Sequence, residues 1–220
     1  MIVARMLKND ETYWAPNDRG EAAGLSWRGS AGSFDELVLH HRRLWAFMTN
    51  SLDKLGIAPP SGRIVEFGAG LGLLDEFVDE TSTIVMLDHT DAFLSQRPHP
   101  LRERCRHLLW SPETLEVLNE EAGTFDWAIA IAVFYHLDDA TAVALIRSLG
   151  ALLATGGYVL IEGYNPASAG ALADIATSER LFSRYPRYVL NVDLLREALW
   201  PDYHELWRDG MLVYRKIRST

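Results

Sequence analysis

The chain has 220 residues, of which 48% are hydrophobic and 23% charged, a balance typical of a globular protein with its own core. The formal net charge of -9 excludes broad binding to a nucleic-acid backbone, which requires a basic face. The single cysteine, Cys105, excludes an intramolecular disulfide and a multi-cysteine zinc site. No apolar run approaches the ~20 residues of a membrane span, so we expect a cytoplasmic protein without a membrane partner.

The first elements differ from the rest of the chain. Residues 1–33 are polar and rich in turn formers, which indicates an irregular arm. Residues 34–56 show helical spacing of their apolar side chains, with Ser33 as a plausible N-cap and Gly56 as a plausible stop. From Arg63 onward, short apolar runs alternate with helical patterns. We expect strands at 63–67, 83–88, 106–110, 125–133 and 158–164, and helices at 73–80, 91–97, 112–121 and 138–157.

This alternation predicts a doubly wound α/β fold, because strands that are apolar on both faces are typical of parallel strands covered by helices. Residues 165–188 do not repeat the unit. A helix at 192–200 and two strands around Asp209-Gly210 follow, and these predict an antiparallel pair at the end of the sheet. We expect one domain in four parts: an arm and helix that form a lid (1–56), a core (57–163), a substrate-side insertion (164–190) and a terminal helix with its hairpin (191–220).

The stretch IVEFGAGLG, residues 64–72, places glycines directly after a strand, where the backbone turns tightly and approaches a ligand closely. The spacing differs from that of a dinucleotide loop, and Glu66 precedes the first glycine. This acid would repel a pyrophosphate but suits a ligand with a cationic amine. Asp88 ends the second strand, where an acid is placed to accept both ribose hydroxyls. Alone, the glycines are also compatible with a tight turn, and Asp88 with a helix cap or a surface acid.

Four motifs in order then resemble the class I S-adenosylmethionine-dependent methyltransferases over roughly residues 36–163: VEFGAGLG, MLDHTD, LLWSPE and FDWAIAIAVFYHLDD, followed by the fifth strand in TGGYVLIEG. The resemblance implies a mostly parallel seven-stranded sheet of order 3-2-1-4-5-7-6, with a reversed last strand and helices on both faces. It also implies S-adenosylmethionine as cofactor and S-adenosylhomocysteine as product.

Carried over by position, the resemblance assigns each residue a part of the cofactor. Glu66 would bind the amine and Asp88 the ribose hydroxyls. The methionine and ribose side would be lined by Gly68, Ala69, Gly70 and Gly72, the adenine by His89, Trp110 and Ser111, and the methionine chain by Val133 and Phe134. Ser111 stands where the family often has an acid. Arg28, in the arm, is a candidate for the methionine carboxylate, and Trp110 is equally compatible with core packing.

Methyl transfer to a hydroxyl or ammonium requires a base near the methyl group. The loop after the fourth strand supplies His136, whose ordinary pKa is near ~6.5, although a histidine here also packs or caps the next helix. Tyr135 is a candidate for bonding the acceptor or packing over the sulfonium, and Glu162 for orienting the acceptor or forming a salt bridge. Asp138 and Asp139 are expected to start the next helix. The two histidines at 40–41 lack metal-ligand spacing, so we expect no metal site.

The favoured function is methyl transfer to an oxygen or nitrogen of a small-molecule metabolite, with natural-product biosynthesis as the expected setting. The acidic composition, the absence of a recognition domain, and aromatic residues in the arm and the insertion support a small acceptor. Three alternatives stay open: cyclisation of the cofactor with release of methylthioadenosine, a non-catalytic cofactor-binding module, and a nucleotide-sugar or NAD enzyme. The sequence leaves open whether the protein is a monomer or a homodimer.

Overall fold

The seven strands of the protein form one sheet. Its computed structural model describes residues 34–88, 91, 94–110, 117–134, 137–162, 191–207 and 211–218. The strands are β1 (Arg63–Phe67), β2 (Thr83–Asp88), β3 (Cys105–Leu109), β4 (Phe125–Ile131), β5 (Leu153–Glu162), β6 (Tyr203–Trp207) and β7 (Met211–Lys216). They lie in the order β3-β2-β1-β4-β5-β7-β6, which confirms the predicted topology.

The first five strands are parallel, and β7 runs antiparallel to both β5 and β6. A parallel sheet brings the carboxyl ends of its strands to one edge, and the order changes direction between β1 and β4. In β1 and β4, Glu66 is in register with Ile129, so the loops that follow these two strands leave the sheet side by side. This edge of the sheet is therefore the place where ligand contacts from several loops can converge.

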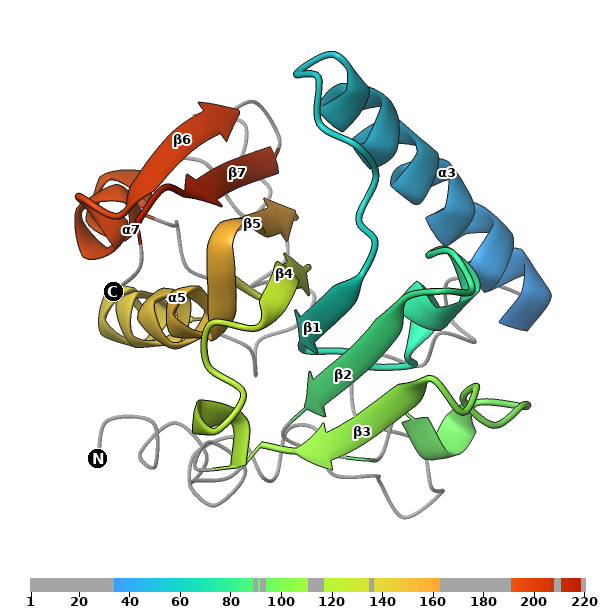
Figure 1. Ribbon diagram of the computed structural model, residues 1–220. Coiled ribbons are helices and arrows are strands. Elements are labelled where there is room, and N and C mark those ends of the chain that lie inside the picture. Colours follow the sequence, from blue (N-terminus) through green and yellow to red (C-terminus); the bar gives the residue numbers. More distant parts are fainter. Residues whose placement is uncertain are drawn as a thin grey trace, which may run out of the picture.

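Helices cover both faces of the sheet (Figure 1). On one face lie α5 (Asp139–Leu152) and α7 (Val192–Leu199), and on the other lies α3 (Phe34–Asp53). Neighbouring residues of β1 point to opposite layers: Val65 packs in the cluster that contains Leu145 of α5, whereas Ile64 packs in the cluster that contains Met48 and Leu52 of α3. Two buried faces on the central strands explain why β1, β2 and β4 are mostly apolar, whereas the edge strand β3 (CRHLL) is only partly buried.

The terminal hairpin also secures the end of α5. Lys216 of β7 is buried, and its Nζ donates hydrogen bonds to the carbonyl oxygens of Gly150 (3.2 Å) and Leu153 (2.9 Å). The hydroxyl of Tyr203 in β6 donates to the same Gly150 oxygen at 2.6 Å. The last carbonyl groups of a helix have few partners within the helix, and the hairpin adds side-chain donors here to the N–H of Leu153, which also donates to Gly150.

Three expected boundaries were wrong. The helix expected at 73–80 is only a short 3₁₀-helix, η1 (Leu73–Glu76), and that expected at 91–97 is η2 (Leu94–Gln96). The helix expected at 138–157 ends at Leu152, because β5 already begins at Leu153. Gly157 explains the last difference: a Cβ there would lie 3.0 Å from backbone oxygens of Phe125 and Asp126, so glycine permits close pairing with β4.

Candidate cofactor site

The glycine-rich loop after β1 is held against the end of β2. The backbone N–H groups of Gly68 and Ala69 both donate to the carbonyl of Leu87, at 2.8 and 3.2 Å, and the N–H of Gly72 donates to Ala69 at 2.8 Å. Gly68, Gly70 and Gly72 all have positive φ, at 72°, 53° and 67°. Because side chains rarely adopt this left-handed conformation, the alternate glycines are required by the path of the loop itself.

The three glycines differ in what surrounds them. A Cβ on Gly68 would lie 2.4 Å from Cγ2 of Val133, and one on Gly72 would lie 2.8 Å from a methyl group of Leu101. A Cβ on Gly70 would meet no described residue within 4 Å. The first and third glycines are therefore needed for packing between loops. Gly70 instead presents its backbone to open space, where a ligand could approach closely.

Asp88 joins the ends of three strands. Its side chain is buried, and Oδ2 accepts a hydrogen bond from the N–H of Gly70 at 2.8 Å. Its backbone carbonyl accepts the N–H of Trp110, which follows β3, at 2.7 Å. The carboxylate at the end of β2 is thus oriented by the backbone of the glycine-rich loop.

Glu66 is a buried carboxyl in the middle of this arrangement. Its side chain is only 6% exposed, and Oε2 has no hydrogen-bond partner among the residues that the structure describes. Burial and, as the smaller cause, the negative charge of Asp88 together raise the pKa of Glu66 from 4.5 to about 8. A buried carboxyl oxygen without a partner is costly, and a cationic donor is the partner that would satisfy it best.

The segment after β4 approaches the loop from the other side. Ala132 has a φ of 58°, which is rare for a residue other than glycine, and its N–H donates to the carbonyl of Glu162 at 2.9 Å. This turn brings Val133 against Gly68, while Phe134 is fully buried. Asp138 then caps α5 by accepting the N–H of Thr141 at 2.8 Å, which confirms the expected helix start.

Trp110 lies in the core beside the site. It is 6% exposed and packs edge-to-face against Phe67, with ring centroids 4.9 Å apart. The packing that the sequence analysis considered for Trp110 is therefore observed, and a contact with a ligand remains a prediction. Glu162 lies at the end of β5, partly buried.

The structure brings most of the predicted cofactor residues together at the carboxyl ends of β1, β2 and β4. The other candidates, Arg28, His89, Ser111, Tyr135 and His136, lie outside the described residues, as do the arm (1–33) of the expected lid and the insertion (164–190). In the described part of the chain, no three His, Cys, Asp or Glu side chains are grouped so that they could hold a metal ion. No helix there is long and apolar enough to cross a membrane.

One residue at the site was missed. Arg97 donates from Nη1 to the carbonyl oxygens of Leu71 and Gly72, at 3.1 and 3.0 Å, and so contacts the end of the glycine-rich loop. No local motif marks this arginine, because its partners lie 26 and 25 residues away. Only the buried position of its guanidinium group, which the sequence does not show, distinguishes it from a surface arginine.

Comparison with known structures identifies the same fold in several methyltransferases. Magnesium protoporphyrin IX methyltransferase from Synechocystis PCC 6803, with bound S-adenosylhomocysteine, has a TM-score of 0.58 at 15% identity, over 96% of this chain and 99% of that one. The 1,6-didemethyltoxoflavin-N1-methyltransferase of Burkholderia thailandensis has a TM-score of 0.55 at 17% identity, over 99% and 89%. An O-methyltransferase family protein from Burkholderia thailandensis has a TM-score of 0.58 at 17% identity, over 84% of this chain and 59% of its own.

A search among curated proteins found no match. The family model described as "Methyltransferase domain" matches residues 38–208, most of the chain. Together with the sheet order and the loop that ends β1, this match settles the family. The chain belongs to the class I S-adenosylmethionine-dependent methyltransferases, and S-adenosylmethionine is its cofactor.

Proposed function

We propose that this protein transfers the methyl group of S-adenosylmethionine to an oxygen or nitrogen of a small-molecule metabolite. One observation carries the assignment of the site: the buried Glu66 has an oxygen without a partner beside a glycine-rich loop whose middle glycine faces open space. These residues fit a nucleoside that carries a cationic amino-acid arm, because the amine would satisfy the carboxyl and the backbone at Gly70 would admit close approach.

In this proposal, each group of residues holds one part of the cofactor. Glu66 accepts hydrogen bonds from the amine, and Asp88 accepts them from the ribose hydroxyls while the N–H of Gly70 holds one of its oxygens. Arg28 holds the carboxylate. The remaining contacts come from the backbone and from packing side chains: Gly68, Ala69, Gly70 and Gly72 along the arm, His89, Trp110 and Ser111 around adenine, and Val133 and Phe134 below the methionine chain.

The bound cofactor supplies a methyl group that is already activated on a sulfonium. The protein therefore has to align the acceptor, exclude water and remove one proton. We assign the removal of this proton to His136, acting as general base, and the orientation of the acceptor to Tyr135 and Glu162. The left-handed turn at Ala132 and the cap at Asp138 support this assignment, since they hold both ends of the loop that carries His136.

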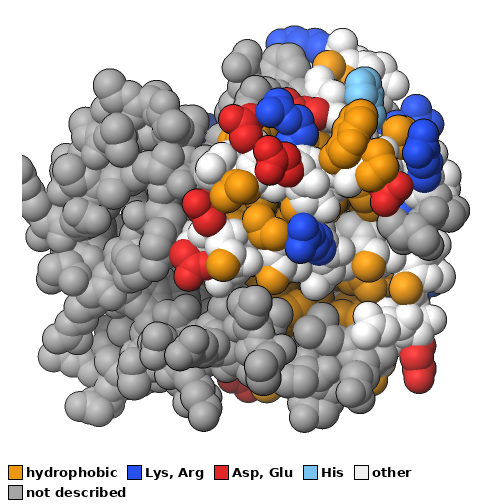
Figure 2. All heavy atoms as spheres, turned by 90° about the vertical axis from the view of Figure 1, so that its left-hand side faces the viewer, with side chains coloured by type: hydrophobic (Ala, Val, Ile, Leu, Met, Phe, Trp, Pro, Cys, Tyr) orange, Lys and Arg blue, Asp and Glu red, His pale blue; other side chains and the backbone are white. Residues whose placement is uncertain are grey.

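The chemistry of the surface supports a small acceptor. Figure 2 shows acidic, basic and apolar side chains interspersed over the described part of the face that lies on the left in Figure 1, where α7 is located. A nucleic-acid acceptor would require clustered basic side chains. Two of the similar structures are named for small-molecule acceptors, a magnesium porphyrin and a toxoflavin precursor.

The central experiment measures turnover. The protein is incubated with S-adenosylmethionine and a panel of metabolites that bear hydroxyl or amine groups, and products are identified by mass spectrometry. We expect S-adenosylhomocysteine together with an acceptor that has gained one methyl group on oxygen or nitrogen. Methylthioadenosine formed without any acceptor would replace the proposal with cyclisation, and binding without turnover across the panel would replace it with a non-catalytic module.

A second experiment tests Glu66 directly by calorimetry with S-adenosylhomocysteine at pH 6.5. Burial raises the pKa of Glu66 to about 8, so the free carboxyl is mostly protonated at this pH, whereas an α-amine with a pKa near ~7.7–8.0 is mostly charged. Binding should therefore release close to one proton, seen as a heat that depends on the ionisation enthalpy of the buffer. Glu66→Gln should abolish this dependence. Equal heats in all buffers for the unaltered protein would exclude Glu66 as the partner of the amine.

A further inference from the structure

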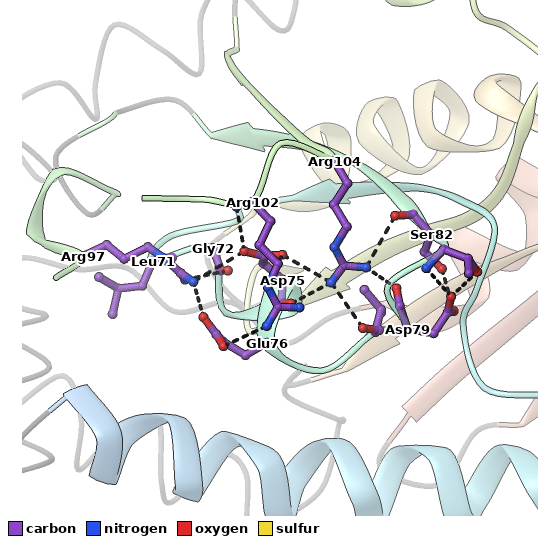
Figure 3. A network of polar contacts seen from close by, with 11 residues as sticks. Leu71, Gly72, Asp75, Glu76, Asp79, Ser82, Arg97, Arg102 and Arg104 are labelled. Carbon is purple, nitrogen blue, oxygen red and sulfur yellow. Dashed lines mark hydrogen bonds and ion pairs between the residues drawn. The ribbon is translucent and has the colours of Figure 1, made fainter. Parts of the chain in front are cut away.

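A buried polar network lies directly behind the glycine-rich loop (Figure 3). At its centre is Asp75 in η1, whose side chain is fully buried. Three arginines from the segment between β2 and β3 surround it: Nη2 of Arg97 at 3.5 Å, Nε of Arg102 at 3.8 Å and Nη2 of Arg104 at 3.3 Å. The network therefore joins the turn after β1 to the chain after β2, the two segments on either side of the candidate site.

Arg97 is the member of this network that contacts the glycine-rich loop. Its side chain is 3% exposed. Nη1 donates to the carbonyls of Leu71 and Gly72, and Nη2 contacts the carboxylates of Glu76 and Asp75. One planar guanidinium group thus binds backbone oxygens on one side and carboxylates on the other, a use of its several fixed donors that a lysine ammonium cannot reproduce.

The start of η1 explains why the carbonyl of Leu71 needs a partner outside the helix. Gly72 is the N-cap of η1, has left-handed backbone angles, and accepts the N–H of Asp75 at 3.3 Å. Leu71 precedes this cap, so its oxygen lies outside the hydrogen bonds of the helix. Arg97 therefore gives the Leu71 oxygen a donor that the helix does not supply, at the point where the loop leaves the site.

We propose that Arg97 is a positioning residue that holds the glycine-rich loop in the conformation that binds the cofactor. It acts through the backbone of Leu71 and Gly72 and touches no part of the ligand. The inference rests on the proposal that this loop binds S-adenosylmethionine. It also implies coupling: a shift of the segment after β2 moves Arg97, and with it the loop that orients Asp88 through the N–H of Gly70.

Arg104 provides a matched control. It is also mostly buried, at 11% exposure, it also contacts Asp75, and it also donates to backbone carbonyls. Those carbonyls belong to Asp75 within η1 and to Val78, Asp79 and Ser82 beyond it, and none of them belongs to the glycine-rich loop. Arg97→Lys and Arg104→Lys therefore remove equivalent contacts from the same network, and only the first removes them from the loop.

The experiment compares these two variants with the unaltered protein by three measurements: the melting temperature, the Kd for S-adenosylhomocysteine by calorimetry, and hydrogen exchange of peptides that cover residues 66–77 without cofactor. Both variants should melt several degrees lower. Arg97→Lys should weaken binding at least tenfold, while Arg104→Lys should stay within threefold. Exchange at the amides of Gly70 and Gly72 should be faster in Arg97→Lys alone.

Equal loss of affinity in both variants, or unchanged affinity and exchange in Arg97→Lys, would overturn the inference. If the unaltered protein binds no S-adenosylhomocysteine, the proposed function fails, and hydrogen exchange then decides the inference by itself. If Arg97→Lys does not fold, Glu76→Gln removes one anchor of Arg97 at a half-buried position. Glu76→Gln should also give faster exchange and weaker binding, but both effects should be smaller than those expected for Arg97→Lys. Exchange and affinity equal to those of the unaltered protein would contradict the proposal.

Discussion

Replacing Glu66 by Gln should change how the stability of the protein depends on pH. Burial and the charge of Asp88 raise the pKa of Glu66 from 4.5 to about 8 in the folded protein. Below pH 4.5 the carboxyl is protonated in both the folded and the unfolded state. Between 4.5 and 8 only the folded state keeps the proton, so the free energy of unfolding falls as pH rises through this window.

The size of the effect follows from the pKa values. Each unit of difference corresponds to about 1.4 kcal/mol, so ionisation of Glu66 costs the folded protein roughly 5 kcal/mol by pH 9, with a slope of about 1.4 kcal/mol per pH unit inside the window. Gln has nearly the same shape and does not titrate there. Glu66→Gln should therefore gain stability relative to the unaltered protein steadily from pH 5 to pH 8.

Urea denaturation of both proteins at half-unit steps from pH 4.5 to pH 9, without cofactor, measures the difference. Asp88→Asn is a useful control, since removing the neighbouring charge should lower the pKa of Glu66 and end the slope at a lower pH. Two stability curves that stay parallel across the window would refute the reasoning, because they would mean that Glu66 has an ordinary pKa in the folded state.

Three further substitutions test individual contacts. Gly70→Ala should cost only the ~1–2 kcal/mol of a left-handed alanine, but it should abolish detectable S-adenosylhomocysteine binding in calorimetry. Gly68→Ala should lower the melting temperature more, because its methyl group also meets Val133. A lower melting temperature for Gly70→Ala than for Gly68→Ala would contradict the assignment of open space to Gly70. Asp138→Ala should lower the free energy of unfolding by about 1 kcal/mol in urea, since it removes the N-cap of α5, and an unchanged midpoint would show that the cap contributes nothing. Lys216→Met should cost about 1–3 kcal/mol, because it removes the ammonium hydrogen bonds to the carbonyls of Gly150 and Leu153, although the hydroxyl of Tyr203 still donates to Gly150. We expect a melting point lower by several degrees, and an equal or higher melting point would mean that water replaces the ammonium.

The sheet could be predicted because its signal is local. Most of the first five strands contain a short apolar run, and the spacing between the runs leaves room for a crossover, so the alternation of strands and helices followed from periodicity. The order of the strands was implied by the family resemblance. The acids at the ends of β1 and β2 could also be identified, because Glu66 interrupts an apolar run and Asp88 ends one. The raised pKa of Glu66 could not be predicted from the sequence, since it depends on how deeply the loops bury the carboxyl group.

The expected helix at 73–80 was wrong for a related reason. Its sequence has helical spacing at Leu74 and Val78, and both side chains are buried as a helix would bury them. The position between them, Asp75, is also drawn inside by arginines that lie more than 20 residues further along the chain. A contact of this kind overrides local propensity and leaves no pattern in the segment itself.

The reversed terminal strand has a consequence for synthesis. β5 pairs on its outer side with β7, the last strand in the sequence, and not with β6. It therefore leaves the ribosome long before its partner strand is made. While the next 48 residues, 163–210, are translated, the peptide groups on the outer side of β5 have no strand to pair with. This segment includes Val159, Leu160 and Ile161, which are all fully buried in the folded protein. An open apolar edge of this kind is a preferred site of aggregation, so we expect nascent chains that stop before β7 to depend on chaperones until they are degraded.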